Sequence, residues 1–156
     1  MSSETIVNAL FLISAVIAAG ILINAIFPVI YRTSETFGAA SHDADVRMRT
    51  DFTIVHAFAK NPDAKIWVKN IGSARIAAGD LDSGDVFIGA EGDFDRLPLA
   101  GHYTIEDQVP VNNFWDPGET LSITLVSGKI PPRGGVAYFA LVLPNGITRS
   151  EGFTTY

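Results

Sequence analysis

The chain has 156 residues, with 17 acidic and 11 basic side chains, a formal net charge of −6 and no cysteine. The negative charge and the lack of a basic stripe argue against nucleic-acid binding. The absence of cysteine excludes thiol catalysis, cysteine-based zinc sites and disulfides, so a folded domain must be held by packing alone. The length suits one hydrophobic segment followed by a domain of about 105 residues.

Residues 5–31 contain no charged side chain. As a helix this segment would be about 40 Å long, more than the roughly 30 Å hydrocarbon core of a bilayer requires. It is about twice as long as the apolar region of a signal peptide, and it has neither a preceding Lys or Arg nor a following A-x-A site. We therefore expect an uncleaved membrane anchor or an assembly helix.

Small side chains interrupt this apolar run at Ser14, Ala15, Ala18, Ala19 and Gly20. Ser14 with Ala18, and Ala15 with Ala19, have the small-xxx-small spacing that lets helix backbones approach closely. The spacing predicts that these five residues pack against a neighbouring helix.

The ends of the apolar run carry polar and helix-breaking features. Asn8 and Asn24 would be costly in lipid without a partner, so they either reach the headgroups or lie in a helix–helix interface. Pro28 should kink or loosen the helix near its exit.

Residues 32–49 are polar but carry a narrow apolar stripe at three- and four-residue spacing. We predict that the helix continues to about residue 48, weakened at Gly38.

From residue 50 the character of the sequence changes. Short segments rich in β-branched and aromatic residues alternate with Gly, Pro, Asn and Asp, and Pro144-Asn145-Gly146 predicts a hairpin turn. The predicted strands are residues 50–58, 65–72, 85–89, 102–107, 120–126, 136–144 and 146–153. Their spacing predicts a two-sheet antiparallel sandwich. The fold class is therefore α+β, with a hydrophobic helix and its polar extension at 1–48 and an immunoglobulin-like β-sandwich at 49–156.

Catalytic chemistry finds little support. The three histidines, His42, His56 and His102, have no metal-ligand spacing and are expected at or near the surface. No Ser lies in a nucleophile-elbow context and no glycine-rich phosphate loop follows a strand. We expect no enzyme, no catalytic residue and no cofactor.

Acidic residues cluster in the segments GDLDSGD and AEGDFD. Alternate carboxylates in a loop suit Ca²⁺, but the EF-hand glycine is misplaced and the closing Glu is absent. The favoured interpretation is solvated turns, and the alternative is a weak Ca²⁺ site. The residues concerned are Asp80, Asp82, Asp85, Glu91, Asp93 and Asp95.

The segment Asp116-Pro117-Gly118-Glu119 is predicted to form a type II turn, because Pro occupies its second and Gly its third position. Trp115, which precedes this turn, is expected to cover one end of the core.

The order of an uncharged N-terminal helix, KIWVKNIGSARI (65–76), FWDPGETLSIT (114–124) and AYFALVLPNG (137–146) resembles the FlaF/FlaG family of archaeal flagellum (archaellum) accessory proteins. The start of the chain looks most like the FlaG branch. The resemblance covers nearly the entire chain and rests on structural motifs. It implies a single-pass protein of the archaeal cell membrane with an extracytoplasmic sandwich. Such a protein would act as a stator or anchor that binds other archaellum accessory proteins, archaellin or surface-layer protein.

Two alternatives remain open. Archaellins share a hydrophobic helix and a sandwich, so the chain could be a pilin/archaellin-like subunit of a homo-oligomer or filament with a helical core. It could also be a membrane-anchored binding domain or enzyme unrelated to motility, which would need a pocket with convergent polar groups. The charges beside the helix disagree with the membrane orientation that the resemblance implies. Arg32, Arg47 and Arg49 follow the helix, and the positive-inside rule would then place the sandwich in the cytoplasm.

The segment Gly146–Tyr156 is expected to be the last strand and to offer unpaired N–H and C=O groups to a neighbour. The interface candidates are Thr148, Phe153 and Tyr156. For the two aromatic residues, packing onto the domain's own core is the alternative.

Overall fold

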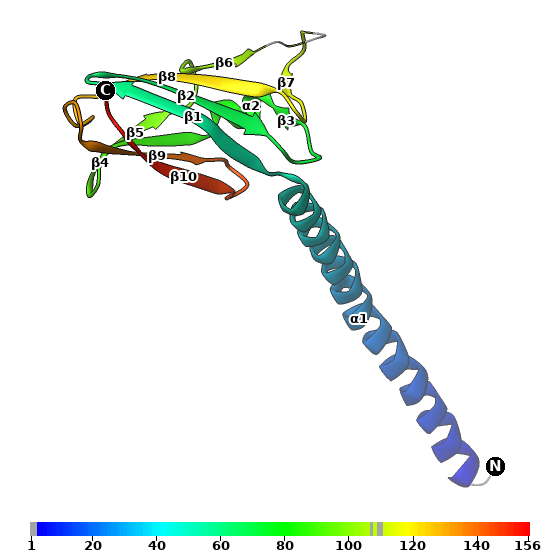
Figure 1. Ribbon diagram of the computed structural model, residues 1–156. Helices are drawn as coiled ribbons and strands as arrows, with labels where there is room; N and C mark the ends of the chain where they lie inside the picture. The colour runs from blue at the N-terminus through cyan, green and yellow to red at the C-terminus, as the bar shows by residue number, and fades with distance from the viewer. Residues whose placement is uncertain (1–2, 107, 109–110) are drawn as a thin grey trace. The chain divides into compact units, whose positions relative to one another are not determined.

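The computed structural model describes residues 3–106, 108 and 111–156. The first two residues of the predicted helical segment and residue 107, the predicted end of one strand, therefore lie outside the described residues. Helix α1 spans Ser3–Arg49 without interruption (Figure 1). The predicted long helix is confirmed. Pro28 and Gly38, where a kink and a weakening were predicted, both lie inside the continuous helix.

Helix α1 ends at a hydrogen-bonded threonine. The backbone N–H and the side-chain hydroxyl of Thr50 both donate to the carbonyl of Val46, at 3.0 and 2.7 Å. Arg47 and Arg49 lie in the last turn, where positive charge complements the partial negative charge of the helix C-terminus. The helix therefore stops where the chain turns into the first strand.

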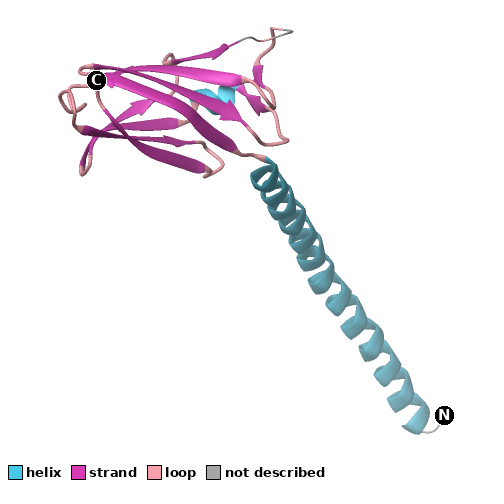
Figure 2. Cartoon of the chain, in the orientation of Figure 1, coloured by secondary structure: helices cyan, strands magenta, loops and turns pink. Residues whose placement is uncertain are grey.

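The rest of the described chain forms two four-stranded antiparallel sheets and a short two-stranded one (Figures 1 and 2). One has four strands in the order β1-β2-β8-β6, the other four in the order β10-β9-β4-β5, and β3 pairs with β7. The bounds are β1 Phe52–Lys60, β2 Asp63–Asn70, β3 Ile76–Ala77, helix α2 Ala78–Asp82, β4 Asp85–Ala90, β5 Asp93–Pro98, β6 Tyr103–Glu106, β7 Phe114–Trp115, β8 Thr120–Val126, β9 Val136–Val142 and β10 Thr148–Thr154.

Every predicted strand corresponds to an observed one, so the predicted α+β sandwich is confirmed. Two differences have local causes. The segment predicted as strand 65–72 begins at Asp63 and ends at Asn70, because Ile71 and Gly72 instead donate to the carbonyl of Asp51. Asp93 and Asp95, expected in turns, lie in strand β5, which pairs with β4 along its whole length.

The core lies between the two sheets and follows the two-residue period of the strands. In β2 the residues Ile66, Val68 and Asn70 share one face and are all buried. Trp115 is also fully buried, with its ring centroid 6.1 Å from that of Phe52, as expected for a residue that covers the core.

The two predicted turns form as expected. Gly118 has φ +89°, and Glu119 N–H donates to the carbonyl of Asp116 at 3.1 Å, which is the type II arrangement. In the β9–β10 hairpin Gly146 has φ +84° and its N–H donates to Leu143 at 2.9 Å.

By its internal contacts the chain divides into two compact units, Met1–Asp43 and Ala44–Tyr156. The domain boundary predicted after residue 48 falls in the last turn of α1, a turn that belongs to the second unit.

Candidate functional site

Helix α1 presents its apolar residues to the surroundings. None of its described residues is buried, and Phe11 and Val16 are 77% and 71% exposed. By length and composition the helix could cross a membrane. A continuous apolar surface of this size must be covered by lipid or by other helices, because a soluble monomer rarely exposes so much apolar area.

The small residues predicted to pack against a neighbouring helix all lie exposed in the middle of α1. Ser14 donates from Oγ to the carbonyl of Leu10 at 2.9 Å, so its hydroxyl is satisfied within the helix. Apart from the neighbouring backbone of the helix itself, nothing lies within 4 Å of the position that a Cβ would take at Gly20. The surface is thus open to a second helix, and packing there stays a prediction. Its members are Ser14, Ala15, Ala18, Ala19 and Gly20.

The exit of α1 is held by a loop that sequence reasoning missed. In this exit loop, residues 71–74, Ser73 and Ala74 donate to the carbonyl of Arg49 at 2.9 and 3.0 Å. Ile71 and Gly72 donate to the carbonyl of Asp51 at 3.1 and 2.9 Å. A Cβ at position 72 would lie 2.5 Å from Arg49 O and Asp51 N, so only glycine fits. The glycine that follows β2 was the available signal.

A buried amide supports the exit loop from inside. Asn70, only 1% exposed, donates from Nδ2 to the carbonyls of Ala74 and Trp115 at 3.0 and 3.1 Å, and its Oδ1 accepts from Gly72 N–H at 3.0 Å. Breaking such a fully satisfied buried group costs more than a surface hydrogen bond, because its partners are left unpaired in the core. The loop is therefore fixed at both its backbone and its side-chain contacts.

The C-terminal interface candidates lie in or just after β10, at the edge of its sheet. Thr148 is exposed, and Arg149 Nη1 donates to its carbonyl at 2.9 Å, which covers part of the edge. Phe153 is half-buried and packs against the core, as the alternative interpretation expected. Tyr156 is exposed, but its ring stacks on Phe58 with centroids 5.4 Å apart. Contact of these residues with a partner stays a prediction.

The acidic segment does not converge on one point. Asp80 and Asp82 lie exposed on α2, whereas Asp85 forms an ion pair with Arg96 at 2.6 Å. The hydrogen bond from this guanidinium holds the pKa of Asp85 below its usual range. Lys129 Nζ lies 2.7 Å from Asp93 and 3.4 Å from Asp95, while Glu91 is exposed at the β4–β5 turn. Within the described residues, no three side chains of the metal-binding types gather.

The histidines are also dispersed. His42 is exposed on α1, and His56 is exposed on β1 with its ring 5.6 Å from that of Trp67. Nδ1 of His102 lies 3.0 Å from the carbonyl oxygen of Pro98. The arrangement thus offers surfaces for association, in an α+β protein with the long-helix-and-sandwich architecture of pilin-like subunits.

No protein-family model matches the chain. An uncharacterised protein of Archaeoglobus fulgidus is 25% identical over 166 residues, which cover 99% of each chain.

Two solved structures that resemble this chain come from the archaellum. The periplasmic stator protein FlaG from Sulfolobus acidocaldarius is 20% identical with a TM-score of 0.53, over 67% of this chain and 99% of that chain. The archaeal flagellum of Methanospirillum hungatei is 14% identical with a TM-score of 0.71, over 99% of this chain and 94% of that chain. The fold of this chain is therefore that of archaellum proteins.

Proposed function

We propose that the chain is a structural component of the archaellum, held by α1 and acting through the surfaces of its sandwich. One observation carries the proposal: a helix with none of its described residues buried precedes a sandwich whose fold is found in archaellum proteins. Such a helix needs lipid or partner helices to cover it. The sandwich adds a rigid domain that can bear contacts without covalent cross-links.

Our first assignment within the archaellum is an anchor or stator protein that binds other accessory proteins, archaellin or surface-layer protein. The family resemblance of the sequence and the likeness of the sandwich to FlaG support it. In this role α1 lies in the archaeal cell membrane and the sandwich lies outside the cell. The protein has no enzymatic role in this proposal and needs no cofactor.

A second candidate is a subunit that polymerises into a filament with a helical core. It is supported by the likeness to the archaeal flagellum of Methanospirillum hungatei, which extends over 99% of this chain and so includes the helix. In that role α1 lies in the filament core, and the apolar surface is covered by other copies.

Deletion of the gene in the native host tests the common proposal, because loss of an archaellum component should abolish or impair swimming. Immunogold labelling separates the two assignments. An anchor is expected at the cell envelope, at the base of the archaellum, and a filament subunit along the filament. Electron microscopy of the purified full-length protein gives a second readout, since only a filament subunit should form long fibres alone. Both assignments would be contradicted if the deletion strain swims normally and, in the parent strain, neither the base of the archaellum nor its filament is labelled.

A further inference from the structure

The outer face of the β1–β2 hairpin carries an alternating row of cations and rings. Cross-strand register places His56 opposite Trp67 and Phe58 opposite Lys65, while the intervening residues Ala64, Ile66 and Val68 are buried. Because successive side chains of a strand point to opposite faces, the row lies on the outside of the sheet. We call this row the basic stripe; it consists of His56, Phe58, Lys60, Lys65, Trp67 and Lys69.

Contacts within the basic stripe hold its side chains in place. Lys65 Nζ lies 4.9 Å from the centroid of the Trp67 ring, and the His56 ring lies 5.6 Å from it. Phe58 stacks on Tyr156 with an interplanar angle of 18°. The ring of Trp67 thus carries a cation on its face. Aromatic residues are enriched in protein interfaces, whereas lysines are depleted there, so the rings rather than the lysines are what this surface shares with known interfaces.

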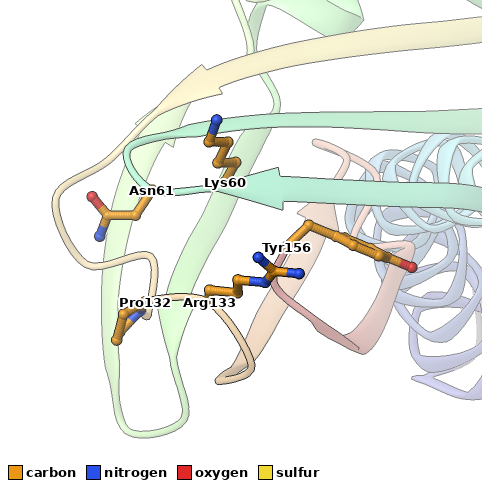
Figure 3. A pocket seen from close by; sticks show the side chains of 5 residues that line it. All are labelled: Lys60, Asn61, Pro132, Arg133 and Tyr156. Carbon is orange, nitrogen blue, oxygen red and sulfur yellow. The ribbon is translucent and has the colours of Figure 1, made fainter.

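The basic stripe continues into a hollow of about 530 Å³ beyond the end of β1. Figure 3 shows this hollow, with Lys60 and Asn61 on one side and Arg133 extending from its loop toward Tyr156. The hollow adds a second cation, Arg133, to the charge that Lys60 brings to this end of the basic stripe.

The cations of the basic stripe differ from the other basic residues of the sandwich. Among the described residues, neither Lys60, Lys65 and Lys69 nor Arg133 forms an ion pair, although the chain as a whole has a net charge of −6. Acidic partners within 4.0 Å are found instead for Arg49, Arg75, Arg96, Lys129 and Arg149. Asp63, exposed and opposite Lys60 in the cross-strand register, offsets part of this charge without forming an ion pair with that lysine. The charge of Lys65 and Lys69 is thus left for a partner outside the chain.

Helix α2 provides an uncompensated surface of opposite sign. Asp80 and Asp82 are exposed and, within the described part of the chain, neither has a basic partner. Asp82 accepts a hydrogen bond from the Tyr103 hydroxyl at 3.1 Å, which places α2 beside β6. In the sheet order β1-β2-β8-β6, strand β8 separates this edge from the hairpin that bears the basic stripe. The two surfaces are therefore distinct parts of one sandwich.

We propose that the basic stripe of one copy binds the α2 surface of a second copy of this chain. The inference rests on the proposed function, because it assumes that copies assemble. A contact made once between two copies is heterologous and leaves each copy a free surface for the next, which builds rows or rings of sandwiches. The same contact made twice, reciprocally, closes a twofold dimer.

The test uses two full-length single-cysteine chains with different tags, mixed in detergent and oxidised gently. Thr124→Cys places a thiol on exposed β8 beside Lys65, and Ser83→Cys places one on the exposed residue that follows Asp82. The chain has no other cysteine. We expect the mixed 124–83 disulfide to exceed both same-site disulfides beyond the statistical ratio, and to decrease with added salt.

Charge reversal then identifies the surfaces. Lys65→Glu with Lys69→Glu in the first chain should lower the mixed disulfide about tenfold, as should Asp80→Lys with Asp82→Lys in the second. Combining the two reversed chains should restore it, which also shows that both variants fold. As a matched control, Ser34→Glu with Ser41→Glu on the exposed polar end of α1 lowers the net charge by the same two units as Lys65→Gln with Lys69→Gln. Only the lysine pair should reduce the yield.

Three results would overturn the inference: a dominant 124–124 disulfide, a mixed disulfide that ignores charge reversal, or no restoration in the reversed pair. If one of these results occurs while the full-length protein still assembles through α1 and is detected at the archaellum by immunogold labelling, the proposed function stands and only this contact is wrong. An acidic partner of another kind would then be the remaining occupant of the basic stripe.

Discussion

Arg149 donates from Nη2 to Oδ1 of Asp51 over 2.6 Å, although the two residues are 98 positions apart in the chain. Asp51 directly precedes β1, and Arg149 lies in β10, so the pair links the edge strands of the two sheets. Through Nη1 the same guanidinium also holds the carbonyl of Thr148.

This pair should contribute modestly to stability. The two side chains are 47% and 41% exposed, so we expect Arg149→Ala to lower the free energy of unfolding by about 0.2–1 kcal/mol. Asp51→Ala should cost more, because Oδ1 of Asp51 also accepts from Phe52 N–H at 2.9 Å. A double-mutant cycle by urea unfolding measures the coupling. Additive effects of the two substitutions would show that the pair contributes nothing.

The apolar surface of α1 predicts the solubility of two forms of the protein. The full chain should need detergent or assembly to stay in solution, because its helix exposes a large apolar surface. A fragment of residues 36–156, which lacks the apolar run, should be soluble and folded. Sedimentation of both forms checks this, and a monomeric full chain without detergent would contradict it.

Helix packing through the small residues can be tested by adding bulk. Ala15→Leu combined with Ala19→Leu should reduce oligomer formation in crosslinking experiments on the full chain, since leucine holds neighbouring backbones apart. Membrane association should remain, because the helix becomes more apolar. An oligomer yield equal to that of the unsubstituted chain would mean that the small-residue face does not pack.

The edge of β10 can be tested by removing one donor. Leu143 N–H donates to the carbonyl of Ile147, so the next pair, Val142 and Thr148, is a non-hydrogen-bonded pair in which the N–H of Thr148 points away from β9. Thr148→Pro should therefore leave the fragment 36–156 folded and monomeric.

In the full chain the same substitution should abolish swimming or self-association if this edge contacts a partner. Normal motility with a folded variant would remove the edge from consideration. An unfolded fragment would show instead that the N–H of Thr148 is needed within the sandwich.

Acidic pH should weaken the sandwich through its paired carboxylates. The hydrogen bond from Asn112 and that from Arg75 lower the pKa of Asp116, and the hydrogen bond from Arg96 lowers that of Asp85, each from an ordinary value of 3.8. A carboxyl with a lowered pKa in the folded state stabilises it fully above the unfolded value and loses that effect as pH falls through the folded value.

Stability of the fragment 36–156 should thus decline below about pH 3.8, as measured by denaturant unfolding at a series of pH values. Asp116→Asn should make the decline smaller, because one of the linked groups no longer titrates. A stability that stays constant or increases on acidification would contradict this prediction.

Strong local patterns made most of the fold predictable. The uncharged run and the narrow apolar stripe of residues 32–49 predict α1. The turn residues Gly118 and Gly146 predict the ends of the strands on either side of them. The segment DFDRLP of β5 was missed, because its charges and proline oppose strand propensity and only pairing with β4 makes it a strand. The two-residue strands β3 and β7 carry too little pattern to be read without the tertiary structure.

The candidate surfaces were predictable to a smaller extent. The small-residue face of α1 and the C-terminal strand follow from spacing and position in the chain. The basic stripe does not, because β1 and β2 contribute alternate residues whose neighbours become clear only from the cross-strand register. The exit loop depends on a close approach between Gly72 and residues 49–51. The glycine after β2 is a local signal for a turn, but the approach to residues 49–51 becomes clear only from the tertiary structure.

The exit loop determines how the sandwich would respond to mechanical force. Tension that travels down α1 enters the domain at Thr50, where four backbone hydrogen bonds already hold the carbonyls of Arg49 and Asp51. Beyond them, β1 is paired with β2 from Phe52↔Asn70 to Lys60↔Asp63, so a pull along the strand loads the ladder in shear and its bonds share the load. A domain without a single disulfide can in this way resist being peeled open from its tethered end.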